Sequence, residues 1–352
     1  MTKLVFVNMP YDFWHAGGWR ALEPDATRGL GGTEFATIMA ARAAARLGRE
    51  VWHAGLVNDR AEKYGVYWIP ITDLRPSLLQ GSLVWLTCYP HVIQAKKHGA
   101  RIVLLWQHWD DYNYCPPGWK SFIDVHGVST KTHEQHCRRV GELMTERFIV
   151  SAFGVEREWL SPLPWQERAP SILYGSSPDR GLHYLLGMYP ALHAATGATL
   201  TIAYNMEEWL AKALSDPRRS DFEQAKTVGY QLKDLLMAGF PITLTGHVNH
   251  RKFLTLLGQS RVLAYPCDVP ESFGLVVAEA IASGCRVVTT NTGSFPEQYG
   301  KRLPLVDISK PEWQMEFQES VINALQSDGP PEPFPLRTWD DHTRDVLEAL
   351  NI

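Results

Sequence analysis

Two glutamates separated by seven residues enclose a segment whose residue types suit the binding of a phosphorylated ligand. The segment runs from Pro270 to Ala280, with Glu271 near its start, Gly274 in its middle and Glu279 near its end. An apolar stretch typical of a buried strand precedes it, and its own apolar residues indicate the first turns of a helix.

The start of this helix is the predicted anion site. We expect Ser272 to be the N-cap, which leaves the next backbone amides, those of Phe273, Gly274 and Leu275, pointing out of the helix. A helix N-terminus carries partial positive charge and binds phosphate or diphosphate, and a glycine lets the ligand approach the backbone closely. Glu279 would lie roughly 9 Å further along the helix axis. The two carboxylates would then flank the anion site and suit hydroxyls at both ends of a sugar nucleotide.

The same segment also has a purely structural interpretation. Phe273, Leu275, Val276 and Ala280 would suit a helix that packs into a core. Glutamates near a helix are common, and so short a pattern does not separate the two interpretations by itself.

A second group of candidates follows the predicted strand Ser171–Gly175. Arg180 directly precedes Gly181, and a guanidinium matches the geometry of phosphate oxygens. Ser176 could add only a neutral hydrogen bond. The alternative is that Arg180 is a solvated turn residue, but the carboxyl end of a strand is where ligands bind in such sheets. We therefore favour a binding role for Arg180.

The first half of the chain offers weaker candidates. Gly31 and Gly32 open the first long helix, and His108 directly follows the predicted strand Arg101–Gln107. A glycine pair also suits a tight turn with positive φ, and a lone histidine also suits a structural role. Both sites nevertheless lie where loops follow strands, which is where chemistry is expected.

Two runs of alternating strands and helices must position these residues. We expect residues 1–162 and 163–330 to form two Rossmann-like, doubly wound α/β domains that face each other across a cleft. The proline-rich stretch Trp159–Pro170 is the predicted linker and hinge. The remaining residues, 331–352, should form a C-terminal helix that packs back on the N-terminal domain.

The composition fits this interpretation and excludes several classes of protein. A chain of 352 residues suits two domains, and a net charge of −4 lacks the basic field of a dedicated nucleic-acid binder. The five cysteines show no zinc-type spacing and indicate reduced thiols, so we expect no metal. No apolar run reaches membrane-spanning length and no signal peptide is evident. We expect a cytoplasmic protein that would meet a membrane only peripherally.

With its surroundings, the segment resembles the Glu-x7-Glu motif of the retaining glycosyltransferase family 4, with Glu271 and Glu279 at its two ends. Residues 280–288 resemble the family's continuation of that motif, and 291–297 resemble its glycine-rich loop ending in glutamate. Upstream, 245–248 resembles the strand end that meets the nucleotide base. These pieces span about sixty residues in the family's order, and they imply a GT-B fold.

The resemblance also implies a role for each candidate residue. Glu279 would hold the ribose hydroxyls, Glu271 the transferred sugar, and Val248 the base. The amides at Gly274 and Leu275, with Arg180, would bind the diphosphate. The Gly31-Gly32 pair would lie beside the donor phosphates, and His108 over the donor sugar. One departure is clear: the family's second arginine is missing from Gly175-Ser176-Ser177.

The implied reaction is retaining transfer from a nucleoside diphosphate sugar to an acceptor hydroxyl, with no cofactor besides that donor. The acceptor would be a glycan, a lipid-linked sugar or a small molecule. Two alternatives stay open: a nucleotide-sugar 2-epimerase-like enzyme of the same fold, and a non-catalytic sugar-nucleotide or glycan-binding protein. A nucleotide dehydrogenase is a weaker alternative, because the first loop lacks a G-x-G-x-x-G pattern.

Overall fold

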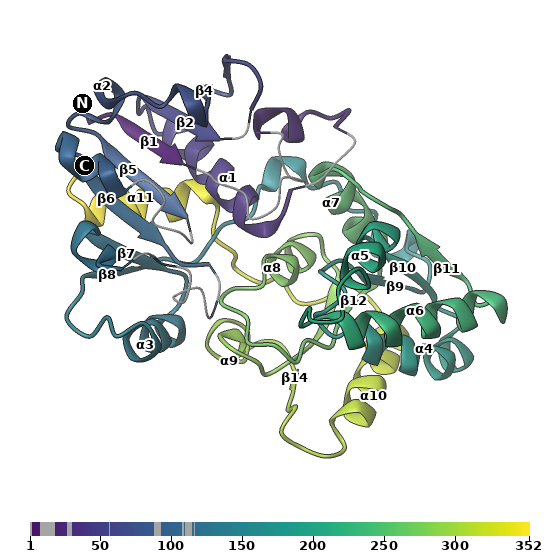
Figure 1. Cartoon of the computed structure of the whole chain (residues 1–352). Helices are drawn as coiled ribbons and strands as arrows, with labels where there is room; N and C mark the ends of the chain where they lie inside the picture. The colour runs from purple at the N-terminus through teal and green to yellow at the C-terminus, as the bar shows by residue number, and fades with distance from the viewer. Residues whose placement is uncertain are drawn as a thin grey trace. The chain divides into compact units, whose positions relative to one another are not determined.

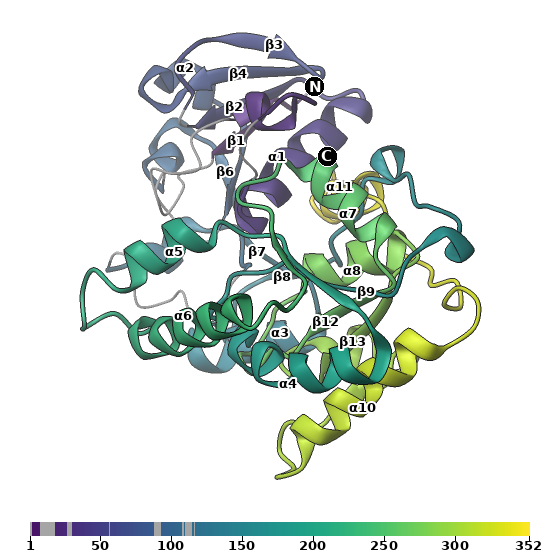
Figure 2. The same ribbon diagram turned by 90° about the vertical axis from the view of Figure 1, so that its right-hand side faces the viewer.

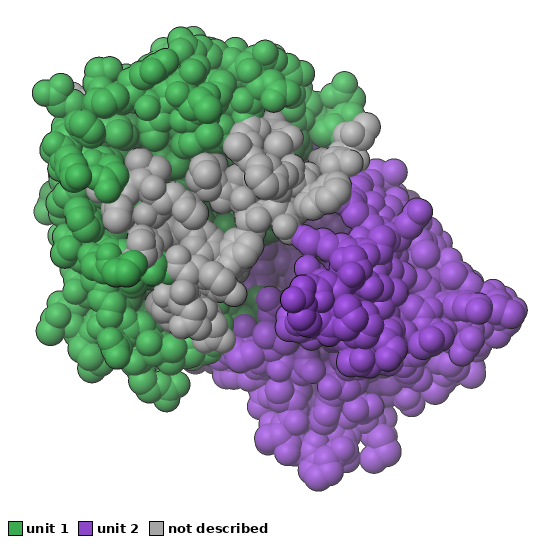
Figure 3. All heavy atoms as spheres, in the orientation of Figure 1, with its two compact units in different colours: residues 1–156, 271–273, 336–352 green, residues 157–270, 274–335 purple. Residues whose placement is uncertain are grey.

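The computed structural model describes residues 2–7, 18–26, 30–55, 57–87, 93–107, 109, 115 and 117–352. The chain divides into two compact units (Figure 3). Unit 1 comprises residues 1–156, 271–273 and 336–352, and unit 2 comprises residues 157–270 and 274–335. The chain thus changes units after residues 156 and 335, rather than after the predicted 162 and 330. In addition, three residues from inside the predicted second domain belong to unit 1.

The described part of unit 1 is built on an eight-stranded sheet (Figure 1). Only its edge strand β3 is antiparallel to its neighbour; the other described pairs are parallel, as the alternation of strands and helices predicts. In spatial order the strands are β3 (Ala61–Lys63), β4 (Val66–Pro70), β2 (Val51–Gly55), β1 (Leu4–Val7), β5 (Leu83–Thr87), β6 (Arg101–Leu105), β7 (Val125–Val128) and β8 (Phe148–Val150).

Helices cover both faces of this sheet, which explains why its strands are nearly continuous runs of buried apolar residues. On one face, Val5, Val84 and Leu104 join a core with Trp106 and Trp119. On the other face Phe6 stacks on Trp85, with ring centroids 5.0 Å apart. The helices of unit 1 are α1 (Gly32–Arg46), α2 (Pro76–Leu79), α3 (Lys131–Val140) and α11 (Trp339–Ala349).

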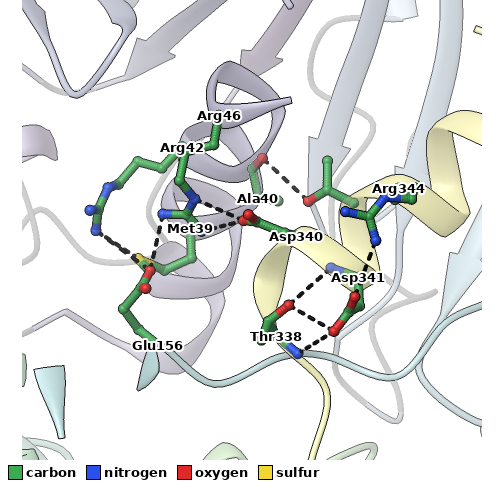
Figure 4. Close-up of polar contacts among 10 residues, drawn as sticks. Met39, Ala40, Arg42, Arg46, Glu156, Thr338, Asp340, Asp341 and Arg344 are labelled. Carbon is green, nitrogen blue, oxygen red and sulfur yellow. Dashed lines mark hydrogen bonds and ion pairs between the residues drawn. The ribbon is translucent and has the colours of Figure 1, made fainter. Parts of the chain in front are cut away.

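The last helix, α11, packs beside α1 within unit 1 (Figure 4). Thr338 and Asp341 form a capping box at its start, in which each side chain accepts a hydrogen bond from the other's backbone amide. Arg46 of α1 donates from Nε to Asp340 at 2.8 Å and from Nη1 to Glu156 at 3.2 Å. Gly154 permits this arrangement, because a side chain there would collide with the backbone at Thr338.

The described part of unit 2 contains a six-stranded, fully parallel sheet (Figures 1 and 2). In spatial order its strands are β11 (Ile242–Leu244), β10 (Thr199–Ile202), β9 (Ser171–Tyr174), β12 (Val262–Tyr265), β13 (Arg286–Thr290) and β14 (Leu305–Val306). The helices are α4 (Leu182–Thr196), α5 (Met206–Ala213), α6 (Phe222–Met237), α7 (His250–Gln259), α8 (Leu275–Ala282), α9 (Phe295–Gln298) and α10 (Trp313–Gln326).

The strand order reverses direction between β9 and β12. From β9 the chain moves outward to β10 and β11, and from β12 it moves the other way to β13 and β14. Because such crossovers are right-handed, the helices after β9 and those after β12 cover opposite faces of the sheet. Such a reversal is a topological switch point, and ligands bind in the crevice outside the strand ends there.

The predicted linker Trp159–Pro170 is packed against unit 2 rather than forming a loose connection. Trp165 is buried, and the Arg168 guanidinium lies over its ring. Arg168 donates to the carbonyls of Leu163, Ser260, Ser283 and Gly284. These contacts hold the segment against the loops before β12 and β13. The chain therefore leaves unit 1 and enters unit 2 between residues 156 and 157.

Candidate functional site

The loops after β9 and β12 meet at the switch point of unit 2. The loop after β9 ends at Gly181, which has φ +91° and is the N-cap of α4. Gly181 lies directly against the carbonyl of Pro266, and a side chain there would collide with it. The chain therefore requires glycine at 181 for two reasons, its left-handed backbone and this close approach.

Arg180 lies in the turn just before this glycine. Its amide donates to the Ser177 carbonyl at 2.9 Å, and its Nε lies 3.8 Å from Asp179 Oδ2. The Arg180 side chain is 31% exposed, so its guanidinium remains accessible to solvent. The turn thus presents a cation at the carboxyl end of the sheet, as predicted.

The polar groups around this turn are closely packed. Ser176 Oγ donates to the Tyr265 hydroxyl at 3.3 Å, and Tyr184 donates to Asp268 at 3.1 Å. Burial raises the pKa of Tyr184, and the nearby Asp268 raises it further. Burial lowers the pKa of His183 despite the opposing influence of Asp268. The groups around the turn are therefore only partly hydrated, which strengthens their electrostatic interactions.

The helix after β12 begins later than predicted. Gly274, rather than Ser272, is the N-cap of α8, and its left-handed backbone (φ +72°) precedes the first helical residue, Leu275. The amides of Val277 and Ala278 both donate to the Gly274 carbonyl. The first helical amides, those of Leu275 and Val276, have no partner earlier in the helix. The predicted anion site thus shifts along the chain, from the amides of 273–275 to those of 275 and 276.

Ser272 cannot cap the helix because its hydrogen bonds hold it in unit 1. Its hydroxyl donates to the carbonyl of Gln107, and its own carbonyl accepts a hydrogen bond from Ser129 Oγ at 2.7 Å. Beside it, Phe273 packs edge-on against Phe153, with centroids 5.1 Å apart. The predicted N-cap role of Ser272 is therefore wrong, and the side chains of Ser272 and Phe273 anchor this segment in unit 1. Glu271, at the start of this three-residue segment, is half-buried.

Glu279 is buried in α8, with 3% of its surface exposed. Its Oε1 lies 2.7 Å from Nε2 of His250, the first residue of α7. His250 was not among the residues predicted from the sequence. Its partner lies 29 positions away in the chain, and a lone histidine in a polar segment carries no signal of such a contact.

The predicted base-binding loop follows β11. Gly246 has φ +66° and Val248 is half-buried. Between them, Nε2 of His247 lies 2.6 Å from Oε2 of Glu208, a residue of α5. Further on, the Arg251 guanidinium lies 4.4 Å from the centre of the Trp159 ring, so this cation is oriented by an aromatic face.

The candidates of the first domain are partly described. Gly31 is the N-cap of α1 with φ −62°, so it is not the positive-φ turn residue that a glycine pair suggests. A side chain at 31 would collide with the carboxylate of Glu34, and Gly32 is the first residue of the helix. His108 lies outside the described residues.

Two further properties bear on the chemistry. Within the part of the chain that the structure describes, no group of three or more His, Cys, Asp or Glu side chains is arranged to hold a metal ion. Among the described helices, none is both long enough and apolar enough to span a membrane.

Residues 231–328 match the family model for glycosyl transferases group 1. Comparison with curated proteins finds no matching sequence. Solved structures similar to the chain include a sucrose-phosphate synthase from Thermosynechococcus elongatus, with 16% identity, a TM-score of 0.64, and 100% and 98% of the two chains covered. A trehalose-6-phosphate synthase has 13% identity and a TM-score of 0.65 over 99% and 95% of the chains. A glycosyltransferase from Rickettsia africae has 14% identity and a TM-score of 0.61 over 99% and 97%.

The fold is therefore GT-B, with two Rossmann-like parallel-sheet domains. Together with the family match over 231–328, this identifies the chain as a glycosyltransferase.

Proposed function

We propose that the chain is a retaining glycosyltransferase related to family 4, which moves a sugar from a nucleoside diphosphate sugar to an acceptor hydroxyl. The observation that carries the proposal is the arrangement at the β9–β12 switch point. There the Arg180 turn packs against the strand end at Pro266, and the same loop leads into the open amides of α8. A cation and a helix N-terminus at one strand edge suit a diphosphate.

The diphosphate would be the leaving group of the reaction. As the bond from the sugar to the diphosphate breaks, negative charge develops on the phosphate oxygens. Arg180 and the amides of Leu275 and Val276 stabilise that charge from positions that are already held by the fold. Ser176 adds a neutral hydrogen bond where related enzymes have a second arginine.

The remaining candidates hold the rest of the donor. The Glu279 carboxylate accepts hydrogen bonds from the ribose hydroxyls, and the backbone at Val248 contacts the base. Glu271, three residues before Gly274, orients the transferred sugar, with His108 as a further contact. The family resemblance also assigns Gly31 and Gly32 to the donor phosphates.

A leaving phosphate oxygen can take the proton from the acceptor hydroxyl, so the scheme needs no dedicated base. It also needs neither a resident metal nor a cofactor, since Arg180 and the helix start supply the positive charge. The acceptor is a glycan, a lipid-linked sugar or a small molecule. A lipid-linked acceptor would bring the enzyme to a membrane surface.

The test is a calorimetric screen of the purified chain against UDP, GDP and ADP sugars with EDTA present. We expect tight binding of one class, and a loss of at least about ten-fold in affinity in Glu279→Ala, because two hydrogen bonds to a charged group are removed. Binding to none of the three would refute the proposal. Conversion of the bound donor sugar without any acceptor would indicate an epimerase instead.

A further inference from the structure

His250 is held in one orientation by its surroundings in unit 2. It is the first residue of α7, whose N-cap Asn249 accepts a hydrogen bond from the Lys252 amide at 2.8 Å. The imidazole lies near two aromatic rings, with centroids 6.1 Å from Trp159 and 6.0 Å from Phe253. Only 12% of its side chain is exposed, so the ring has little freedom to rotate.

The ring is directed at the carboxylate of Glu279. The Nε2 to Oε1 distance of 2.7 Å is that of a charge-assisted hydrogen bond. An ionised carboxylate only accepts hydrogen bonds, so Nε2–H of His250 is the donor. A carboxylate as buried as that of Glu279 needs such a donor, because an unpaired buried charge is costly.

The first turn of α7 also packs against the loop after β9. The Phe253 ring fills the space beside Gly175 where a side chain would otherwise lie, and Val276 of α8 borders the same space. The turn that carries His250 thus contacts both the loop after β9, which is the predicted phosphate loop, and α8. These are the two parts of the proposed donor site.

We propose that His250 is a positioning residue for donor recognition. It engages Oε1 of Glu279, fixes the carboxylate rotamer and leaves the second oxygen to accept the hydrogen bonds of the two ribose hydroxyls. This inference rests on the proposed function, because it gives Glu279 the ribose-binding role. His250 itself makes no contact with the reacting atoms.

The test compares ribose with its deoxygenated counterpart. Calorimetry would measure the affinities of UDP, GDP and ADP, and of their 2′,3′-dideoxy analogues, for the wild-type chain and three variants. His250→Phe keeps an aromatic ring near Trp159 and Phe253 but removes the donor. His250→Gln keeps an N–H near the position of Nε2. His193→Phe is the matched control, since His193 bonds only to the backbone carbonyl of Ala198 at the far end of α4.

We expect His250→Phe to bind the preferred nucleotide about ten-fold more weakly than the wild type, the size of one charge-assisted hydrogen bond. Its affinity for the dideoxy analogue should equal that of the wild type, because the lost contact acts through the ribose. His250→Gln should recover most of the affinity, and His193→Phe should match the wild type. If His250→Phe unfolds, His250→Asn, whose amide is too short to reach Glu279, replaces it.

The outcomes separate this inference from the proposed function. If Glu279→Ala loses ribose discrimination but His250→Phe and His250→Asn retain it, the role of His250 is wrong and the donor site stands. Equal weakening of ribose and dideoxy ligands would mean that His250 only supports packing, which also overturns the inference. A wild-type chain that does not discriminate ribose from its dideoxy form refutes the role of Glu279, and the inference with it.

Discussion

The two units share a doubly wound architecture but use their buried polar groups differently. In unit 1 the imidazoles of His53, His126 and His342 are buried in the interior. Among the described residues, its best-buried ion pair is Arg42 with Glu156, which lies where α1 meets the end of the first segment of the unit. In unit 2 the imidazole–carboxylate pairs lie near loops that follow strands, with His250 on Glu279 and His247 on Glu208.

The buried polar groups of the two units therefore have different roles. In unit 1, polar side chains join segments that are distant in the chain. In unit 2 they orient carboxylates close to the strand edge where a ligand would bind. The comparison holds for the described residues. The switch point of unit 1 lies between β1 and β5, and residues 8–17 and 88–92, which follow those strands, lie outside them.

The largest expected contrast is the response of the units to acid. Burial lowers the pKa of His53 to about 3 and the pKa values of His126 and His342 to about 4, from an ordinary value of 6.5. Between pH 6.5 and 4 these three imidazoles become protonated in the unfolded chain but stay neutral in the folded chain. The free energy of unfolding of unit 1 therefore decreases as the pH falls. Each imidazole lowers the free energy of unfolding by about 1.4 kcal/mol per pH unit below 6.5, which gives about 6 kcal/mol for the three at pH 5.

Hydrogen exchange at pH 7 and pH 5, read by mass spectrometry, would measure this contrast. We expect strands β1, β5 and β7 to lose protection at pH 5 before strands β9, β12 and β13 do. Carboxylates with lowered pKa values, such as Asp341, act only near and below their ordinary value of 3.8 and do not affect this window. Earlier loss of protection in unit 2 would contradict this difference between the buried polar groups of the two units.

A smaller effect should follow from opening the ion pair in unit 1. Glu156→Ala removes the partner of Arg46 at 3.2 Å and of Arg42 at 4.0 Å, and Glu156 and Arg42 are both nearly buried. We expect unfolding to become about 3 kcal/mol easier, because the nearly buried Arg42 loses this carboxylate, while Arg46 keeps its bond to Asp340. Calorimetric unfolding would measure it, with the more exposed Asp340→Ala as the control, expected to cost less than about 1 kcal/mol. If both variants lost the same free energy of unfolding, burial would not explain the contribution of Glu156 to stability.

The smallest expected effect concerns the turn at Arg180 and Gly181 in unit 2. Gly181→Ala adds a side chain against the Pro266 carbonyl at a left-handed backbone position, and should destabilise unit 2 by about 2 kcal/mol. Gly197→Ala is the matched control, since it has φ +66° but open space around it, and should cost about 1 kcal/mol. Denaturant unfolding gives both values. Nucleotide affinity should fall only for Gly181→Ala, and a parallel fall for Gly197→Ala would contradict a local effect on the Arg180 turn.

Much of the fold follows from local patterns in the sequence. The apolar runs that become β1, β5 and β6 are long and bounded by turn residues, and the alanine-rich run that becomes α1 ends at Leu47 and Gly48. The strands β3, β4 and β14 were not predicted, and β3 and β14 are too short to show a clear period. Arg180 and Gly181 follow β9, as the predicted strand Ser171–Gly175 indicates, but the approach of Pro266 that also requires glycine at 181 comes from a distant part of the chain.

The errors arose where a distant partner decides the role of a residue. Ser272 has the residue type and spacing of an N-cap, but a carbonyl 165 positions earlier in the chain, that of Gln107, accepts its hydrogen bond. The helix then begins at Leu275, after Gly274. His250 was overlooked for the same reason, because its significance comes from Glu279 on another helix. Such pairings depend on tertiary structure, which spacing along the chain does not encode.

The placement of α11 in unit 1 has a consequence for the order of events on the ribosome. Trp339 packs against Phe35 of α1, yet it is synthesised after every residue of unit 2. Domains usually fold in the order in which they emerge. Here the unit that emerges first cannot be completed until residues 336–352 have been synthesised, whereas the second unit has its whole chain as soon as residue 335 has left the exit tunnel. In the nascent protein, unit 2 is therefore expected to mature before unit 1, although most of unit 1 is synthesised first.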